Sequence, residues 1–258
     1  MIPIKTRQEV EHMRAACRLA SQILDEVSAM LCPGLTTKEV DLAAAKLMAD
    51  AGCQSAFLGY KKFPGNICIS LNDEVVHGIG SPRRIQYGDI VKLDIGVILD
   101  GFVGDTAATV PVGEVTEEVR RLLEVTENAL YTGIEKAREG RRLSAVCAAI
   151  QDAVEQNGFS VVREFVGHGV GRHLHEEPQI PNYRTSATTA RLRAGMTLAI
   201  EPMVNRGKPG VMLLQDNWTV VTADHTPSAH FEHTILVTKG EPEILTWREK
   251  TSSQLKAK

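Results

Sequence analysis

The chain has 258 residues, of which 43% are hydrophobic and 24% are charged, and its formal net charge is −3. This composition is ordinary for a globular protein with a large core, and the small negative charge gives no reason to expect nucleic acid or a membrane as partner. No run approaches the ~18 apolar residues that cross a bilayer, and residues 1–5 lead into a charged helix without a secretory signal.

Two capping boxes predict the first two helices. Thr6-Arg7-Gln8-Glu9 begins a long amphipathic helix whose apolar stripe extends to Leu31. Thr36-Thr37-Lys38-Glu39 begins a shorter helix that ends at Ala51-Gly52.

A strand with one apolar face follows over residues 91–97. Its residues Val91, Leu93, Ile95 and Val97 share one face, because side chains alternate along a strand. Asp94 lies on the opposite face. This pattern indicates a sheet with one face packed on helices and the other turned toward a polar centre.

The helix pattern then occurs a second time. A long helix is predicted from about Thr116, and a short one begins after Ser144 and ends at Asn157-Gly158, a helix C-terminal signal. Two further strand segments follow; in the first, Glu201 lies opposite Leu198 and Ile200, and in the second, Glu232 points with His230 and Thr234. The segments are Leu198-Ala199-Ile200-Glu201 and His230-Phe231-Glu232-His233-Thr234.

The two halves share several spacings. These are HG-x-G at 77–80 and 168–171, a glycine six residues before Asp94 and Glu201, and a Gly-Glu pair eight residues after Asp105 and Glu232. Repeats in one order predict a duplicated half folded about a pseudo-twofold axis. We therefore predict a single catalytic domain over 1–258, with halves of about 1–114 and 115–248 and a flexible tail over 249–258.

Such a duplication would bring five polar side chains to one centre, namely Asp94, Asp105, His168, Glu201 and Glu232. One such carboxylate alone is more often a solvated strand residue, but the repeat favours a shared site. Buried acids without partners are unfavourable by several kcal/mol, roughly, so the site should hold cations. Carboxylate oxygens with one imidazole suit divalent Mn, Fe, Co or Zn, and two bridged ions would use all five ligands in hydrolase chemistry.

These residues and their neighbours closely resemble type I methionine aminopeptidases, in the short bacterial form. The resemblance extends from about Thr6 to Val237 and is carried by Asp94, Asp105-Thr106, Gly167–Gly171 with His175–Pro178, Ala199–Pro202 and Phe231–Thr234. It implies the α+β pita-bread fold, also called the creatinase/aminopeptidase fold. In that fold, two pseudo-symmetric halves form a curved antiparallel sheet covered by helices.

The resemblance also implies a role for each site residue. Asp105 and Glu232 would bridge two divalent metal ions, Asp94 would complete the shell of one ion, and His168 and Glu201 that of the other. A metal-bridging hydroxide would attack the first peptide carbonyl, with Glu201 as general base and then acid. His77 would contact the substrate near its amino end, and His175 would hydrogen-bond the scissile amide and steady the intermediate.

A side-chain pocket is expected around the methionine of the substrate. Aromatic residues are scarce, yet three of them fall within residues 57–63, and a thioether packs well against aromatic rings. With the resemblance, the predicted substrate-binding residues are His77, Phe57, Tyr60, Phe63, Cys68, Leu174, His175 and Trp218. Many bacterial members have cysteine in place of Phe57, tyrosine in place of Phe63 and phenylalanine in place of Leu174.

The expected substrates are the N-terminal peptides of nascent proteins with a small second residue, met at the ribosome by a monomeric enzyme. The five cysteines show no C-x-x-C spacing, which favours reduced thiols in the cytoplasm. His230 and His233 flank Glu232, and a supporting role for them is favoured over metal ligation. Three alternatives stay open: an X-Pro hydrolase of the aminopeptidase P or prolidase type, a pita-bread binding module without catalysis, and a non-haem iron oxygenase.

Overall fold

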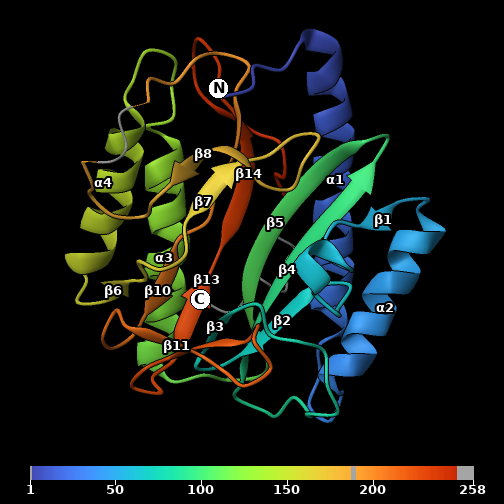
Figure 1. The fold of residues 1–258 in the computed structure, drawn as a ribbon. Coiled ribbons are helices and arrows are strands. Elements are labelled where there is room, and N and C mark those ends of the chain that lie inside the picture. Colours follow the sequence, from blue (N-terminus) through green and yellow to red (C-terminus); the bar gives the residue numbers. More distant parts are fainter. Residues whose placement is uncertain (1, 187–189, 249–258) are drawn as a thin grey trace.

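The computed structural model describes residues 2–186 and 190–248, and Figure 1 shows their arrangement. The expected tail over 249–258 lies outside these residues. The α-helices of the described chain are α1 (Arg7–Met30), α2 (Thr37–Asp50), α3 (Glu117–Ile134) and α4 (Leu143–Glu155). None of these helices is long and apolar enough to cross a membrane.

The helix starts follow their capping residues. Both predicted capping boxes form, with Thr6 and Glu9 at the start of α1 and Thr36 and Glu39 at the start of α2. The predicted start of α4 was wrong, since the helix begins at Leu143 and not after Ser144. Its N-cap residue makes no side-chain cap; instead the Leu143 N–H donates to the Ala190 carbonyl 2.9 Å away.

A curved antiparallel sheet of nine strands forms the centre of the molecule (Figure 1). The strand order is β1-β4-β5-β14-β9-β7-β8, with β15 paired to β14 and β2 paired to β4. The strands are β1 (Gln54–Ser55), β2 (Cys68–Leu71), β4 (Ile90–Leu99), β5 (Phe102–Pro111), β7 (Gly167–Gly169), β8 (Glu176–Ile180), β9 (Thr197–Ile200), β14 (Glu232–Leu236) and β15 (Glu243–Ile244).

Two three-stranded sheets, β13-β10-β6 and β11-β12-β3, complete the strands of the described chain. Their members are β3 (Glu74–Val76), β6 (Ser160–Val161), β10 (Met203–Asn205), β11 (Val211–Leu213), β12 (Val220–Thr222) and β13 (Ser228–His230), and a short 3₁₀ turn, η1, spans Tyr60–Lys62. The expected single strand over residues 230–234 is in fact two strands. Its first part pairs with β10, whereas Glu232 onward pairs with β5 and β9, so the chain changes sheets at Phe231.

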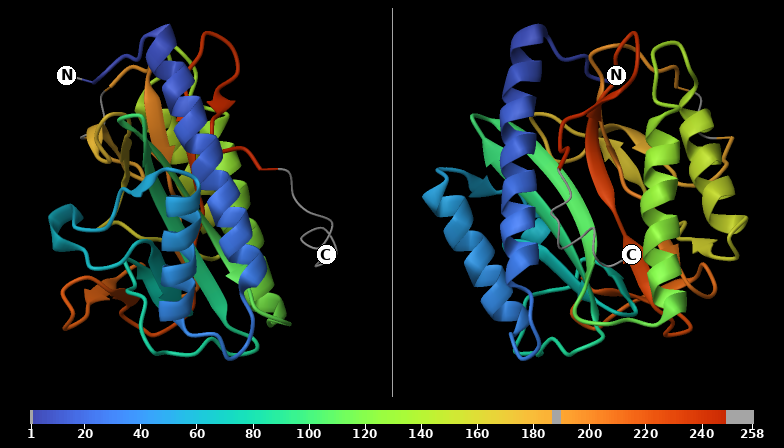
Figure 2. Two further views of the ribbon diagram at one scale, coloured as in Figure 1. Left: turned by 90° about the vertical axis from the view of Figure 1, so that its right-hand side faces the viewer. Right: turned by 180° about the vertical axis from the view of Figure 1, so that it is seen from behind.

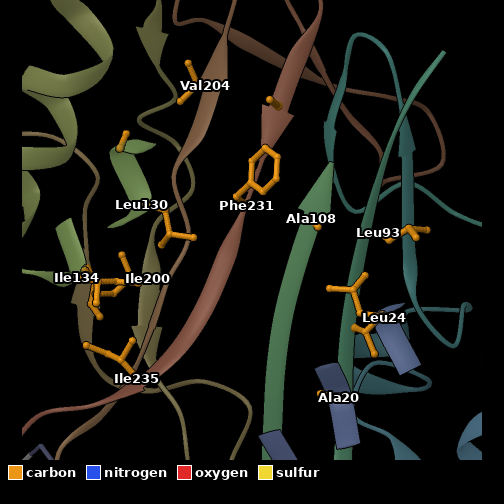
Figure 3. Packing of buried hydrophobic residues seen from close by; sticks show 14 of the residues in the cluster. Ala20, Leu24, Leu93, Ala108, Leu130, Ile134, Ile200, Val204, Phe231 and Ile235 are labelled. Carbon is orange, nitrogen blue, oxygen red and sulfur yellow. The ribbon is translucent and has the colours of Figure 1, made fainter. Parts of the chain in front are cut away.

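The helices lie on one face of the large sheet, as the side and rear views of Figure 2 show. The hydrophobic core fills the layer between helices and sheet. Figure 3 shows residues of this layer from both halves, with Ala20 and Leu24 of α1 on the same side as Leu93 and Ala108, and Leu130 and Ile134 of α3 on the side of Ile200 and Ile235. The other face of the sheet carries the polar positions, and this architecture confirms the expected α+β class with a curved antiparallel sheet.

Matched backbone contacts support the duplication of the halves. The Gly34 N–H donates to the Ile85 carbonyl at 2.8 Å, and the Gly140 N–H donates to the Leu192 carbonyl at 2.9 Å. Both glycines have positive φ, 94° and 81°, a conformation that side chains disfavour. In each half, a glycine turn thus follows the long helix and forms a hydrogen bond with the segment that precedes a strand of the large sheet, β4 in one half and β9 in the other.

Candidate metal centre

Five neighbouring strands of the large sheet each bring one candidate ligand to the face away from the helices. In sheet order these are Asp94 on β4, Asp105 on β5, Glu232 on β14, Glu201 directly after β9, and His168 on β7. All five line one pocket. The strand register brings them together, since Ala107 pairs with Asp94 on one side and with Glu232 on the other.

The ligand atoms lie close to one another. One ligand atom from each of Asp105, His168 and Glu232 lies within 4.8 Å of the other two. His168 Nε2 is 3.4 Å from a Glu201 carboxylate oxygen and 3.8 Å from Asp105 Oδ2. These distances bring four of the five predicted ligands into one cluster, and Asp94 shares its pocket.

A backbone contact fixes the tautomer of His168. Its Nδ1 lies 2.9 Å from the Gly169 carbonyl oxygen, which can only accept, so Nδ1 carries the hydrogen and donates it. Nε2 is left with its lone pair, facing the carboxylates, as a metal ligand requires. Burial lowers the pKa of His168 to about 3, which keeps the ring neutral.

The glycines beside His168 permit this close packing. A Cβ on Gly167 would lie 2.4 Å from the Ala199 carbonyl oxygen, and one on Gly169 would lie 2.2 Å from the Glu177 carbonyl oxygen. Any side chain at these positions would therefore push β7 away from β8 and β9. The Gly-His-Gly sequence brings His168 into the carboxylate cluster.

The carboxylates have the electrostatics of a cation site. Burial raises the pKa of Asp94 to about 7 and raises the pKa values of Asp105, Glu201 and Glu232 well above their ordinary range. Within the described chain, one oxygen of each of Asp94, Asp105 and Glu232 is buried without any hydrogen-bond partner. Buried oxygens of this kind need a proton or a cation, and the donor set of carboxylates with one neutral imidazole fits divalent metal ions.

Two further histidines line the pocket beside the cluster. His77 has a left-handed backbone (φ 60°). Its ring is nearly perpendicular to those of Phe165 and Trp218, with 5.3 Å and 6.2 Å between ring centroids. The His175 ring lies against the His168 ring, with 4.2 Å between ring centroids and a tilt of 41° between their planes. Desolvation in the pocket lowers the pKa of each of His77 and His175 to about 4, so both rings are neutral at physiological pH.

The expected side-chain pocket opens next to the carboxylates. Its lining contains every residue predicted for it, namely Phe57, Tyr60, Phe63, Cys68, Leu174 and Trp218 together with His77 and His175. The Phe63 and Trp218 rings pack edge to face, with 5.1 Å between ring centroids. Burial raises the pKa of the Cys68 thiol, so this side chain is a small uncharged group in an aromatic wall.

Sequence reasoning missed several lining residues: Lys61, Val76, Phe165, Val166 and Met203. Phe165 and Val166 directly precede Gly167-His168. Their position beside a candidate metal ligand could have indicated that they line the pocket. Lys61 and Lys62 have positive φ angles of 47° and 74°. Lysine gives no sign of such a turn in a sequence, so the approach of Lys61 to the pocket could not be predicted.

The histidines beside Glu232 differ in their surroundings. His233 lies 2.9 Å from Thr246 Oγ1 and 3.3 Å from the Tyr131 hydroxyl, and it does not line the pocket. His230 is 1% exposed, and its Nε2 lies 3.7 Å from a Glu201 oxygen. Neither belongs to the cluster of close ligand atoms in the described residues.

Comparison with known proteins agrees with this geometry. A family model described as metallopeptidase family M24 matches residues 11–239. The chain is 49% identical over 246 residues to methionine aminopeptidase 1 of Bacillus subtilis (strain 168), covering 95% of this chain and 99% of that protein.

Solved structures give the same result. The crystal structure of methionine aminopeptidase from Rickettsia prowazekii superposes with a TM-score of 0.94 at 42% identity, over 96% of this chain and 100% of that one. The prolidase from Pyrococcus furiosus shares the fold with a TM-score of 0.78 at 24% identity, and this chain covers 66% of it.

Proposed function

This chain belongs to metallopeptidase family M24, and we propose that its pocket is a dinuclear metal centre that cleaves the first peptide bond of a polypeptide. The chain is a metallo-aminopeptidase that removes the N-terminal methionine of its substrates and uses divalent metal ions. One observation supports the metal centre most directly. Five strands that are neighbours in the large sheet direct four carboxylates and a neutral histidine into one pocket. Three of the carboxylate oxygens there have no hydrogen-bond partner among the described residues.

Two ions account for this donor set better than one. Asp105 and Glu232 would be shared between the ions, Asp94 would bind the first, and His168 with Glu201 would bind the second. The 3.4 Å separation of His168 Nε2 from Glu201 and the closeness of Asp105, His168 and Glu232 support this division. The ions are Co, Mn, Fe or Zn, all of which accept oxygen and imidazole ligands.

The residues of the pocket then have distinct tasks. Divalent ions held by these residues would lower the pKa of a bound water and so supply a nucleophile near neutral pH. A Glu201 carboxylate oxygen takes the proton of the attacking water and returns it to the departing amine. The His175 ring donates a hydrogen bond to the carbonyl that is attacked, and His77 contacts the substrate near its amino end.

The aromatic wall would hold the methionine side chain. Phe57, Tyr60, Phe63 and Trp218 offer rings to a thioether, and each sulfur–ring contact is worth ~0.3–1.5 kcal/mol. Cys68 and Leu174 close the wall with small apolar surface. By the family resemblance, the residue after the methionine is small.

We further propose that the substrates are nascent proteins, met at the ribosome in the cytoplasm by a monomeric enzyme. The cysteines support a reducing compartment, because all five lie in the described part of the chain and are present as thiols. The X-Pro hydrolase alternative has only the shared fold of the prolidase in its favour. A binding module without catalysis would have no need of the complete ligand set that the pocket contains.

Substitution of Glu201 tests the proposal. We expect the manganese-loaded protein to release methionine from Met-Ala-Ser and to leave an X-Pro dipeptide intact. Glu201→Gln should lower kcat by about 10²–10⁴-fold, because the amide cannot take up the proton. Glu124→Gln is the matched control, since Glu124 lies exposed on α3, and it should keep full activity. Hydrolysis of X-Pro in preference to Met-Ala-Ser would contradict the proposed function.

A further inference from the structure

A tyrosine hydroxyl contacts the ring of His175. The Tyr60 hydroxyl oxygen lies 2.9 Å from His175 Nδ1, and the two rings stack with 5.3 Å between centroids and 17° between planes. We propose that Tyr60 is a positioning residue that donates this hydrogen bond and holds His175 as the tautomer whose Nε2 carries the hydrogen. The inference deepens the proposed function, on which it rests, by naming the group that prepares His175 to act as a donor.

The chemistry of the two partners sets the direction of this hydrogen bond. A phenol is a stronger acid than a neutral imidazole N–H, and an unprotonated imidazole nitrogen is a stronger base than a phenol oxygen. The O–H of Tyr60 donating to Nδ1 is therefore the favoured arrangement. The hydrogen bond made by one ring nitrogen decides which nitrogen carries the hydrogen, so Nε2 of His175 becomes the donor.

The backbone around His175 is held independently of Tyr60. Glu176, the next residue, forms a buried ion pair of 2.5 Å with Lys5 from the N-terminal segment. The other oxygen of Glu176 accepts from the His173 N–H at 3.2 Å. Because these contacts fix the chain on both sides of His175, the main freedom left to this residue is rotation of its ring, and the Tyr60 contact restricts that rotation.

Tyr60 is itself fixed by its turn. The Gly59 N–H donates to the Phe63 carbonyl and the Phe63 N–H donates to the Tyr60 carbonyl, both at 2.8 Å. Gly59, Lys61 and Lys62 all have positive φ, so the turn has an unusual backbone that other sequences would not adopt readily. The turn holds the tyrosine ring against His175 at the edge of the pocket.

The tautomer decides whether His175 can assist the reaction. With the hydrogen on Nε2, the ring offers a donor to the carbonyl oxygen as negative charge develops there. With the hydrogen on Nδ1, Nε2 would present a lone pair to that oxygen and repel it. A neutral histidine is a competent donor of this kind, provided that its tautomer is fixed.

Nuclear magnetic resonance of the imidazole nitrogens tests the tautomer directly. The sample is the full chain loaded with zinc, which is diamagnetic, with ¹⁵N-labelled histidine, and His175→Gln assigns the His175 signals. We expect wild-type His175 to show a protonated Nε2 and an Nδ1 that accepts a hydrogen bond. In Tyr60→Phe, which keeps the ring, the Nδ1 resonance should shift and the two tautomers should interconvert. A protonated Nδ1 in the wild type, or an unchanged His175 spectrum in the variant, would overturn the proposal.

Kinetics on Met-Ala-Ser separate positioning from packing. Tyr60→Phe should lower kcat about tenfold with little change in KM, whereas His175→Ala, which removes the donor itself, should lower kcat about 100-fold. In the His175→Ala background the Tyr60→Phe change should have no further effect, because the two residues act as one unit. An additive effect would overturn the role of Tyr60.

Tyr131→Phe is the matched control, since its hydroxyl lies 3.3 Å from the Nε2 of a different histidine, His233, outside the pocket. It should leave both kcat and the His175 spectrum unchanged. Failure of the wild-type protein to release methionine would instead contradict the proposed function, while the His175 spectrum would still decide whether Tyr60 donates to His175.

Discussion

The residue Gly96 has a direct part in shaping the wall of the pocket beside the carboxylates. A Cβ at this position would lie 2.5 Å from the ring of Phe57, which is buried in the pocket wall. Gly96→Ala should therefore displace the Phe57 ring, raise the KM for Met-Ala-Ser several-fold, and lower the free energy of unfolding by about 1–3 kcal/mol, as overpacking does. Steady-state kinetics and urea unfolding of the metal-loaded enzyme measure both effects.

A glycine in an open position is the control for this substitution. The Cβ of an alanine at Gly210 would have its nearest contact at 3.7 Å, on Ala223, which is ordinary packing. Gly210→Ala should leave KM unchanged. If Gly96→Ala behaved in the same way, Phe57 would not form part of the methionine site.

Sequence reasoning at the residue scale succeeded where a regular period applies. Alternation along β4 placed Asp94 opposite Leu93 and Ile95, and both apolar side chains are buried in the core as expected. The contact between Gly96 and Phe57 could not be predicted in this way. It joins two segments whose approach depends on the pairing of β1 with β4, and no local signal in the sequence encodes that pairing.

Among the elements, α2 depends on one buried carboxylate for its attachment to the pocket. One oxygen of Asp41 accepts from the Asn66 N–H at 2.7 Å and from the Ile67 N–H at 3.3 Å. The other accepts from the Asn66 side-chain amide at 3.0 Å and from Lys38 Nζ at 3.1 Å. Asn66 lies between Phe63 and Cys68, two residues of the pocket wall. The helix therefore positions this wall through Asp41.

Asp41→Asn should loosen the attachment of α2. The amide keeps one oxygen as acceptor but replaces the other with an NH₂ group, which cannot accept the two hydrogen bonds made there, and the negative charge is lost. We therefore expect a loss of about 2–3 kcal/mol in the free energy of unfolding. Urea unfolding measures this loss, and the KM for Met-Ala-Ser should rise with it. Asp50→Asn is the control, because Asp50 ends the same helix in an exposed ion pair with Lys46 and should change stability by less than about 1 kcal/mol. Equal effects of the two substitutions would contradict the role of Asp41.

Local signals explain which element boundaries could be predicted. The starts of α1 and α2 followed from capping boxes, which are contained within four consecutive residues. The start of α4 and the break between β13 and β14 were wrong for a common reason. In both cases the boundary is set by a contact with a segment distant in the sequence and not by the neighbouring residues. Leu143 donates a hydrogen bond to Ala190, and β13 pairs with β10.

For the whole molecule, acids from both halves meet at one centre, and we expect this arrangement to make stability depend on metal ions. The carboxylates come from strands of both halves, with β5 paired to β14 where the halves meet. The repeat in the sequence was sufficient to predict that these residues converge. It contained no information on the hydrogen-bond partners of each oxygen, which depend on the strand register.

The pH dependence of stability should reveal this linkage. Burial raises the pKa of Asp94 from 3.8 to about 7 in the protein without metal, and the pKa values of Asp105, Glu201 and Glu232 are raised as well. A carboxyl that binds its proton more tightly when folded favours the folded state below its unfolded pKa. That contribution is lost as the pH rises from about 4 through 7. These carboxyls should therefore lower the stability of metal-free protein as the pH rises from 6 to 8.

Divalent metal ions should reverse this trend, because they replace the protons that the buried acids would otherwise hold. The rise in melting temperature on adding manganese should be larger at pH 8 than at pH 6 by several degrees, since about 1 kcal/mol shifts the melting temperature of a chain of this length by roughly 2–4 °C. Differential scanning fluorimetry with and without manganese at both pH values measures the effect. Subtracting the melting temperature without manganese removes the contribution of titrating groups that are remote from the site. Asp94→Asn, which removes one of the raised carboxyls, should reduce the pH dependence of the manganese effect. An equal manganese effect at both pH values would show that the carboxylates do not exchange protons for metal, and the linkage between the centre and the fold would be contradicted.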